Sequence, residues 1–226
     1  MHHRVPSEEL NGVSVTIEPG RFTLLSGGAE SGAGALLRVL GLLERADGGE
    51  VWIEARATSG LDDAARLELR NRFFGFLFAE PFLLDSFNVA ENVAMPLFKI
   101  AGVEIEEARM RTGQVLEFAG LSWAADMPVG ELGTLERHKV SLARAVAIEP
   151  RVLIAEDVAS HLGAEEGRGF AELVRSVPGA LGIGVIATSP TEGEIFGADR
   201  VIRLERGVIV ADSQPEPAQE EAEAHD

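Results

Sequence analysis

One segment of the chain, residues 27–35, has the spacing of a phosphate-binding loop but lacks the side chains that such a loop uses. A loop of the pattern GxxxxGK[ST] surrounds phosphates with backbone N–H groups, places a lysine on the β- and γ-phosphates and places a hydroxyl on Mg²⁺. Here the lysine position is Ala33 and the hydroxyl position is Gly34. The segment therefore predicts the shape of a nucleotide-binding protein without the groups that act on the nucleotide. The positions that would contact a nucleotide, if one binds, are Gly27, Gly28, Ala29, Glu30, Ser31, Gly32, Ala33, Gly34 and Ala35.

The loop lies between a strand-like run at residues 22–26 and a helix-like run at residues 36–43. Along the rest of the chain, short apolar runs alternate with longer helical patterns, which is typical of an α/β fold with a parallel sheet covered on both faces. The other strands are predicted at residues 51–53, 74–78, 152–155, 183–187, 201–204 and 208–211, with a hairpin turn at Arg206 and Gly207 joining the last two.

The middle of the chain has a different pattern. Between about residues 87 and 147 the sequence predicts helices at 89–100, 104–119 and 135–147 and no strand, which indicates an α-helical subdomain inserted into the α/β core. The α/β domain as a whole is predicted to span residues 1–212. From residue 213 to 226 the chain is acidic, contains proline and has no apolar face, so a disordered tail is expected there.

Composition excludes several classes of function. A formal net charge of -17 argues against binding to nucleic acid, because such binding depends on Lys and Arg neutralising phosphates. The chain has no cysteine, so disulfides and thiolate metal sites are ruled out, and His2 and His3 are interpreted as a frayed terminus rather than a metal site. No apolar run approaches the roughly 20 residues that span a bilayer, and no signal peptide is evident. A cytoplasmic protein is expected.

The order of these segments resembles the ATPase subunit of an ATP-binding cassette (ABC) transporter, especially the small ATPases that serve lipoprotein-release, macrolide-export and cell-division permeases. The resemblance covers roughly residues 10–212 and implies a P-loop NTPase-like ABC ATPase fold with an inserted α-helical subdomain. The segments that carry it are residues 36–45, 47–51, 75–78, 82–84, 90–97, 131–132, 139–145, 152–155 and 198–202.

Against this family, the positions that carry chemistry hold other residue types. The glutamine that links Mg²⁺ and water to the permease-facing loop corresponds to Ala79, and the switch histidine corresponds to Ser189. The acidic pair is inverted to Glu156 and Asp157, where Asp157 is one methylene short for a general base, so a surface or capping pair is favoured over catalysis. The Leu-Ser-Gly-Gly signature corresponds to Leu132, Gly133, Thr134 and Leu135, and the downstream aspartate to Gly163.

Three further side chains bear on the loop and the signature helix. Arg38 lies one helical turn beyond the loop and is predicted to point away from the phosphates. Glu30 is predicted to occupy the anion cradle itself, because loop N–H groups that hold a phosphate also favour a carboxylate. For Arg144 and Lys139, contact with solvent or pairing within their own helix is expected.

The departures are concentrated at chemical positions, whereas the strand cores and turns keep their patterns, so a loss of ATPase chemistry along the whole chain is predicted. No cofactor and no metal are expected, with weak ATP binding through backbone groups left open. The leading hypothesis is a catalytically inactive ABC subunit, a pseudo-ATPase, that holds or regulates a membrane complex. The alternatives are a weak or partner-dependent ATPase and a soluble scaffold that uses the old nucleotide cleft for another ligand.

The resemblance also implies partners. Residues 82–98 are rich in Phe, Leu, Val and Pro where the family docks the cytoplasmic helix of an integral-membrane permease. Head-to-tail dimerisation with an identical or different ABC ATPase-like chain is also implied, which would place the protein on the inner face of a membrane through a partner. The residues predicted to dock the permease are Phe82, Leu83, Leu84, Phe87, Met95 and Phe98.

Overall fold

The computed structural model describes residues 10–189 and 197–213. The two N-terminal histidines and the predicted acidic tail beyond Ser213 lie outside the described residues. The strands are β1 (Phe22–Ser26), β2 (Trp52–Ile53), β3 (Arg56–Ala57), β4 (Phe74–Phe78), β5 (Val152–Glu156), β6 (Gly184–Ser189), β7 (Arg200–Glu205) and β8 (Val208–Ser213). The α-helices are α1 (Ala33–Leu40), α2 (Asp63–Phe73), α3 (Val89–Pro96), α4 (Ile105–Phe118), α5 (Thr134–Val146) and α6 (Ala164–Leu181).

Six strands form one sheet in the order β4-β5-β6-β1-β7-β8, and β2 with β3 forms a separate two-stranded ribbon. All neighbours in the large sheet are parallel except β7 and β8. The predicted hairpin turn between these two is confirmed, because Arg206 and Gly207 both have positive φ, at 49° and 75°. A two-residue turn of this kind matches the twist of its strands only when both residues adopt such angles.

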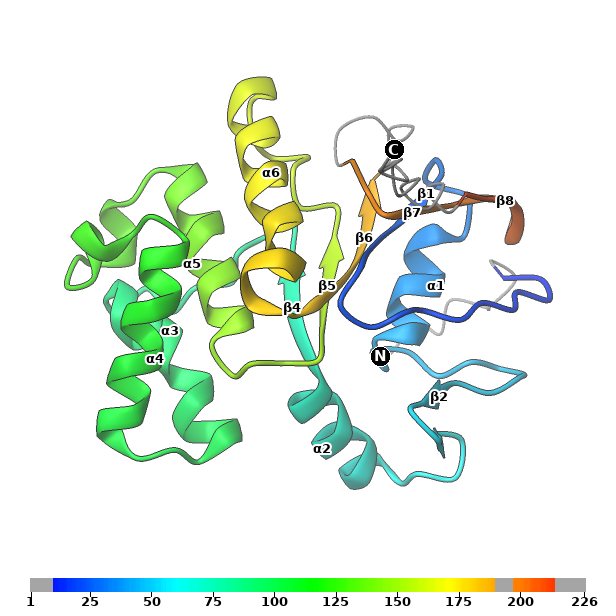
Figure 1. Cartoon of the computed structure of the whole chain (residues 1–226), viewed down its shortest axis with the longest axis horizontal. Coiled ribbons are helices and arrows are strands. Elements are labelled where there is room, and N and C mark those ends of the chain that lie inside the picture. Colours follow the sequence, from blue (N-terminus) through cyan, green and yellow to red (C-terminus); the bar gives the residue numbers. More distant parts are fainter. Residues whose placement is uncertain (1–9, 190–196, 214–226) are drawn as a thin grey trace, which may run out of the picture.

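Apolar side chains cover both faces of the sheet, as the continuous apolar strands predict. Phe22 and Leu24 of β1 point into the larger cluster, which they share with α3, α4, α5 and α6. Leu25 points to the opposite face, where it joins Leu36 and Leu37 of α1. Alternation along a strand therefore explains why α1 packs on one side of the sheet and the remaining long helices on the other. Figure 1 shows α1 and α5 on opposite sides of β5 and β6.

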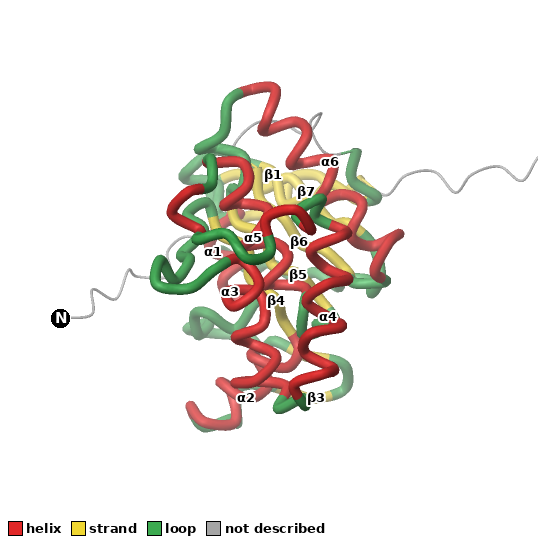
Figure 2. The backbone as a smooth tube through the Cα atoms, turned by 90° about the vertical axis from the view of Figure 1, so that its left-hand side faces the viewer, coloured by secondary structure: helices red, strands yellow, loops and turns green. Residues whose placement is uncertain are grey.

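Only helices lie between β4 and β5. After α3 the chain continues as a π-helix, Leu97–Ala101, and short 3₁₀ turns at Ser122–Ala124 and Val129–Glu131 separate α4 from α5. Figures 1 and 2 show these helices gathered at one end of the molecule, beside the β4 edge of the sheet. Close approach of α5 to β4 depends on Gly75, since a Cβ atom there would lie 2.3 Å from the carbonyl oxygen of Ala145.

The sequence pattern gave no prediction for α2 or α6. Helix α2 buries none of its residues, so it lacks the apolar periodicity that identifies a helix, although the Asp62 side chain caps it by accepting a hydrogen bond from the Ala65 N–H. Helix α6 buries an apolar face but contains glycines and Pro178, which are poor helix formers. Between residues 10 and 21 the chain forms no strand before β1.

Candidate functional site

The parallel strands bring most of the predicted chemical positions to one edge of the sheet. Ser26 at the end of β1 is level with Ser189 at the end of β6, and Phe78 of β4 is level with Glu156 of β5. The phosphate loop, Ala79, the acidic pair and Ser189 therefore share the carboxyl edge, where open α/β sheets bind their ligands. The signature positions are separate, because they lie at the start of α5.

The phosphate loop is built on glycine backbone geometry. Gly27 and Gly32 have φ values of 155° and 90°, which residues with a side chain rarely adopt. A Cβ atom on Gly27 would lie 2.4 Å from the Cβ atom of Ser31, and the carbonyl oxygen of Gly28 accepts a hydrogen bond from the Ser31 N–H at 2.9 Å. The buried Ser31 Oγ in turn accepts from the Ala33 N–H at 3.2 Å. One of the loop amides at the start of α1 is thus satisfied internally.

The prediction that Glu30 fills the anion cradle is wrong. Its side chain is exposed, and no N–H of the described residues donates a hydrogen bond to it. Glu30 occupies a central position of the turn that the Ser31 N–H closes onto Gly28, so its side chain projects from the surface.

The prediction that Arg38 points away from the loop is also wrong. Its Nη1 donates to Glu156 Oε1 at 2.9 Å, and its Nε donates to Glu44 Oε1 at 2.8 Å. Residues four apart share one face of a helix, which brings Arg38 next to Gly34 and the end of β5. Burial by itself lowers the pKa of Arg38, but its hydrogen bonds to Glu156 and Glu44 raise the pKa above its ordinary value. The guanidinium is therefore a permanent positive charge at this edge.

The two acidic residues at the end of β5 have different surroundings. Glu156 is half-buried and ion-paired with Arg38, which agrees with the interpretation of a structural pair. Asp157 has a positive φ of 46°, and its N–H donates to Thr188 Oγ1 at 3.1 Å. Its carbonyl oxygen accepts from Ser160 Oγ at 3.0 Å. The backbone of Asp157 is thus fixed between β6 and the following turn.

Two imidazoles converge on Ala79, which sequence reasoning did not foresee. His138 Nε2 of α5 lies 3.0 Å from the Ala79 carbonyl oxygen, and His161 Nδ1 lies 3.2 Å from the same atom. The buried His138 ring also lies edge-on to Phe170 of α6. The backbone at Ala79 is therefore held by side chains from two other segments, and no side chain at this position reaches toward the loop.

The signature positions serve packing. Leu132 is buried and Leu135 is half-buried against the larger core cluster, while Gly133 is the N-cap of α5. The carbonyl oxygen of Thr134 lies 2.8 Å from His138 Nδ1. A branched side chain at 135 fills core space where the family's glycine exposes backbone.

The segment predicted to dock a partner presents aromatic side chains on a braced backbone. Phe82 is 65% exposed, Phe98 46%, Leu84 40% and Phe87 37%. Phe82 also has a positive φ of 45°, an outlier for a bulky residue. Leu83, in contrast, packs against the larger core cluster and so belongs to the core rather than to the exposed row.

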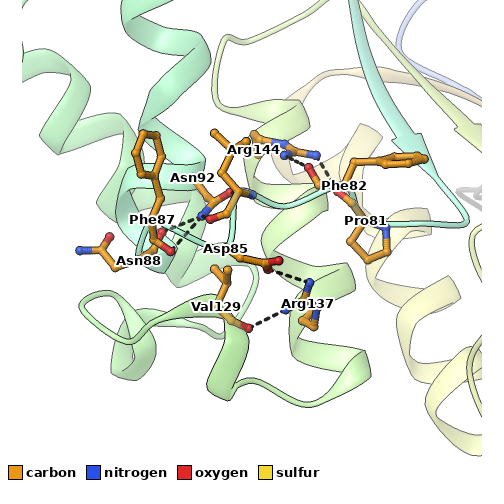
Figure 3. Close-up of polar contacts among 10 residues, drawn as sticks. Pro81, Phe82, Asp85, Phe87, Asn88, Asn92, Val129, Arg137 and Arg144 are labelled. Atoms are coloured by element: carbon orange, nitrogen blue, oxygen red, sulfur yellow. Dashed lines mark hydrogen bonds and ion pairs between the residues drawn. The ribbon is translucent and has the colours of Figure 1, made fainter.

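Arg144 holds the turn at Phe82 in place, so the expectation of solvent contact or intrahelical pairing is wrong for this residue. Its Nη1 donates to the carbonyl oxygen of Phe82 at 2.8 Å and its Nη2 to that of Pro81 at 2.7 Å (Figure 3). Burial lowers the pKa of Arg144, because it removes water from around the guanidinium. An arginine in the last turn of a predicted helix gave no signal of this contact with a loop far away in the sequence.

Asn92 braces the same segment from α3. This fully buried amide accepts from the Leu84 N–H at 2.8 Å and donates to the carbonyl oxygens of Leu84, Phe87 and Asn88. Arg137 of α5 adds a bond to the carbonyl oxygen of Val129 and a 3.4 Å contact with Asp85 (Figure 3). The loop before α3 is therefore ordered by side-chain hydrogen bonds to its backbone.

A groove of about 690 Å³ continues this surface between α3, the π-helix and α4. Phe87, Met95 and Phe98 line one side, and Ile105 and Thr112 belong to the other. Thr112 Oγ1 is buried without a hydrogen-bond partner among the described residues. Three of the predicted docking residues thus share one mostly apolar depression.

No helix in residues 10–189 and 197–213 has both the length and the apolar character to cross a bilayer. Within the same described ranges, no group of three or more His, Asp or Glu side chains has an arrangement that would hold a metal ion. The carboxyl edge of the sheet carries Glu156, which is paired with Arg38, and Asp157 next to it.

Comparisons with known proteins match this arrangement to one family. The family model described as "ABC transporter" matches residues 10–160. The lipoprotein-releasing system ATP-binding protein LolD of Saccharophagus degradans is 34% identical over 202 residues, covering 89% of this chain and 88% of that protein. LolD of Myxococcus xanthus is 35% identical over 200 residues, covering 88% and 89%. The dimeric ATP-binding cassette MJ0796, solved in a post-hydrolysis state bound to ADP and Pi, superposes with a TM-score of 0.79 at 27% identity, covering 91% of this chain and 90% of that one.

Proposed function

We propose that this chain, which belongs to the ABC transporter family, is a non-catalytic cassette subunit that docks on a membrane permease. It acts as a structural or regulatory partner from the cytoplasmic face. The observation that carries the proposal is the contrast between two sites of one chain. The phosphate loop has lost its lysine and hydroxyl, whereas the docking segment presents Phe82, Phe87 and Phe98 on a hydrogen-bonded scaffold.

The loss of hydrolysis follows from what phosphoryl transfer needs. Such catalysis is positioning plus charge stabilisation, and an ionised hydrogen bond of the kind a loop lysine makes contributes about 1.5–3 kcal/mol. Ala33 supplies no charge, and the Ala33 N–H already donates to Ser31 Oγ. Ala79 and Ser189 offer neither a metal-linking amide nor a switch imidazole at the positions that supply them in the family.

The docking surface fits an amphipathic helix of a permease. An apolar groove recognises such a helix through a row of apolar anchors, and the groove of about 690 Å³ between α3 and α4 offers aromatic walls for them. The strained backbone at Phe82, held by Arg144, keeps an aromatic side chain exposed in the docking segment. Strain that the surroundings enforce is typical of binding surfaces.

Pairing with a second cassette is part of the proposal. MJ0796 is a dimer, and in a head-to-tail pair the phosphate loop of one chain would face the signature of the other. A homodimer of this chain would then contain two sites with Ala33 on one side and Leu135 on the other. A heterodimer with an active cassette would leave each site with one altered half.

Capture from membranes tests the docking half. The tagged chain is expressed in its native host, membranes are solubilised in mild detergent, and the integral-membrane proteins that co-purify are identified. We expect Phe82→Ala combined with Phe98→Ala to reduce recovery of the permease at least about tenfold, as for interface anchors. Trp123→Ala is the matched control, because Trp123 is also 65% exposed but lies outside the groove and the docking segment. Equal recovery with all three proteins contradicts docking at this surface.

An ATP hydrolysis assay tests the claim that the chain is non-catalytic, and it distinguishes this proposal from a partner-dependent ATPase. Turnover of MgATP is measured for the chain alone and for the captured complex, with Asp157→Asn as the comparison. We expect no turnover that depends on Asp157 in either sample. If the complex hydrolyses ATP and Asp157→Asn abolishes that hydrolysis, the chain is a partner-dependent ATPase instead.

A further inference from the structure

Arg38, Glu156 and Gly34 meet at the place where the family's hydroxyl and first carboxylate lie. Arg38 Nη1 is 2.9 Å from Glu156 Oε1. A Cβ atom built on Gly34 would lie 3.1 Å from Arg38 Nη1 and 3.6 Å from Glu156 Oε1. The guanidinium thus occupies the space that a side chain at position 34 would otherwise share with the Glu156 carboxylate.

Mg²⁺ does not fit these residues. The ion requires near-octahedral oxygen ligands at about 2.0–2.1 Å and is commonly held by one or two carboxylates together with phosphates. Position 34 supplies no oxygen from a side chain, and Glu156 already bonds a cation. A metal at Glu156 would also lie within a few ångströms of the guanidinium, where like charges repel strongly.

Arg38 supplies the positive charge next to Glu156 that a metal ion would otherwise supply. Its side chain is 31% exposed and that of Glu156 is 27% exposed, so the pair is partly shielded from water. A buried carboxylate is costly unless it is paired, and Arg38 both neutralises Glu156 and connects α1 to the end of β5. Glu44 holds the other side of the guanidinium at 2.8 Å and fixes its orientation.

We propose that Arg38 is the resident cation of this edge: it excludes divalent metal from Glu156 and fixes the phosphate loop helix to β5 without a nucleotide. The inference rests on the proposed non-catalytic function and deepens it, because it names the residue that replaces the metal. It assigns Gly34 a definite role, since the absence of a side chain there makes room for the guanidinium.

Binding of Mn²⁺, used alone as a paramagnetic probe for Mg²⁺, tests the proposal. Free Mn²⁺ is followed by electron paramagnetic resonance at constant ionic strength, with Glu156→Gln as the background for weak binding to the acidic surface. We expect the natural chain and Glu156→Gln to bind Mn²⁺ equally. Tighter binding by the natural chain overturns the proposal.

A double variant provides the complementary test. The double variant Gly34→Ser with Arg38→Ala places a hydroxyl at position 34 and frees the Glu156 carboxylate from its ion pair. Because both groups add oxygen ligands, we expect the variant to bind one additional Mn²⁺, with an affinity at least about tenfold higher than that of the natural chain. Adding Glu156→Gln should abolish this binding, and Gly34→Ser alone should show none because Arg38 remains. A folded double variant without the additional site overturns the proposal. If the double variant does not fold, the comparison of the natural chain with Glu156→Gln still decides.

The outcome is distinguishable from failure of the proposed function. Binding of Mn²⁺ at Glu156 in the natural chain refutes the resident cation but leaves hydrolysis and permease capture to be judged by their own assays. Turnover of MgATP refutes the non-catalytic function whatever the Mn²⁺ titration shows. Thermal unfolding gives an independent readout. We expect Arg38→Ala to have a lower Tm than the natural chain, and we expect Mn²⁺ to leave the Tm of the natural chain unchanged.

Discussion

The phosphate loop edge, which comprises residues 27–38 with 156–157, and the docking segment, residues 82–98, differ in what their polar side chains do. At the loop edge the backbone shape remains and the chemical side chains are gone, with Arg38 and Glu156 satisfying each other. In the docking segment polar side chains fix a loop so that aromatic residues stay exposed. The proposed non-catalytic docking function rests on this difference between the two regions.

The first prediction concerns whether the loop shape is needed by the fold. Gly27→Ala is expected to lower the free energy of unfolding by about 3 kcal/mol, because the new Cβ meets Ser31 and the backbone at Leu204 and the φ angle is unfavourable. Chemical denaturation measures the change. Gly28→Ala is the control, since nothing lies within 4 Å of its Cβ position. Equal stability of the two variants would show that the turn is a remnant that the fold does not require.

The second prediction compares buried polar contacts in the two regions. Asn92→Ala is expected to cost about 2 kcal/mol, because it removes the acceptor of the Leu84 N–H and the side-chain donor to the carbonyl oxygens of Leu84, Phe87 and Asn88. Ser31→Ala, which removes the acceptor of the Ala33 N–H, should cost about 1 kcal/mol or less. Denaturant midpoints of both variants measure the difference. A larger loss at Ser31 would reverse the comparison and make the loop the more tightly held region.

The third prediction isolates the brace on Phe82. Arg144→Ala should destabilise the chain by about 1–2 kcal/mol through loss of two charge-assisted hydrogen bonds to the carbonyl oxygens of Pro81 and Phe82. Limited proteolysis should then cut near Phe82 faster than in the natural chain. Arg144→Lys keeps the charge but cannot donate to both carbonyl oxygens in the same way, so its cleavage rate should lie between those of the natural chain and Arg144→Ala. Unchanged cleavage in Arg144→Ala would show that the turn holds its conformation without the arginine.

The fourth and smallest effect concerns Glu30. Since its side chain is exposed at a turn, Glu30→Ala should change stability by no more than about 0.5 kcal/mol. It should also leave the affinity for ATP, measured by calorimetry, the same as that of the natural chain. A marked gain in ATP affinity would revive the idea that the carboxylate blocks the cradle.

Much of the fold could be predicted because its strands carry strong local signals. The continuous apolar runs of β1 and β5 and the turn at Arg206 and Gly207 are recognisable without tertiary information. Helix α2 could not be predicted, because it buries no residue and so has no apolar periodicity. Its stability depends on its cap at Asp62 and on neighbours that the sequence does not identify.

Within the candidate site, the replaced positions were predictable and their new contacts were not. Ala33, Ala79 and Leu135 can be identified by spacing along the chain. The bond from Arg38 to Glu156 joins residues 118 positions apart, and the bonds from Arg144 reach back more than 60 positions. Such pairs depend on where the strands and helices place long flexible side chains, which helical periodicity alone does not specify.

The missing side chain at Gly34 also bears on how positions 34 and 38 depend on each other. A serine at this position would meet the Arg38 guanidinium at 3.1 Å before it met any metal. A side chain at position 34 and the guanidinium at position 38 are therefore coupled, and Glu156 loses its cation if Arg38 is replaced. Under the proposed function, substitutions at 34 and 38 should have non-additive effects on stability.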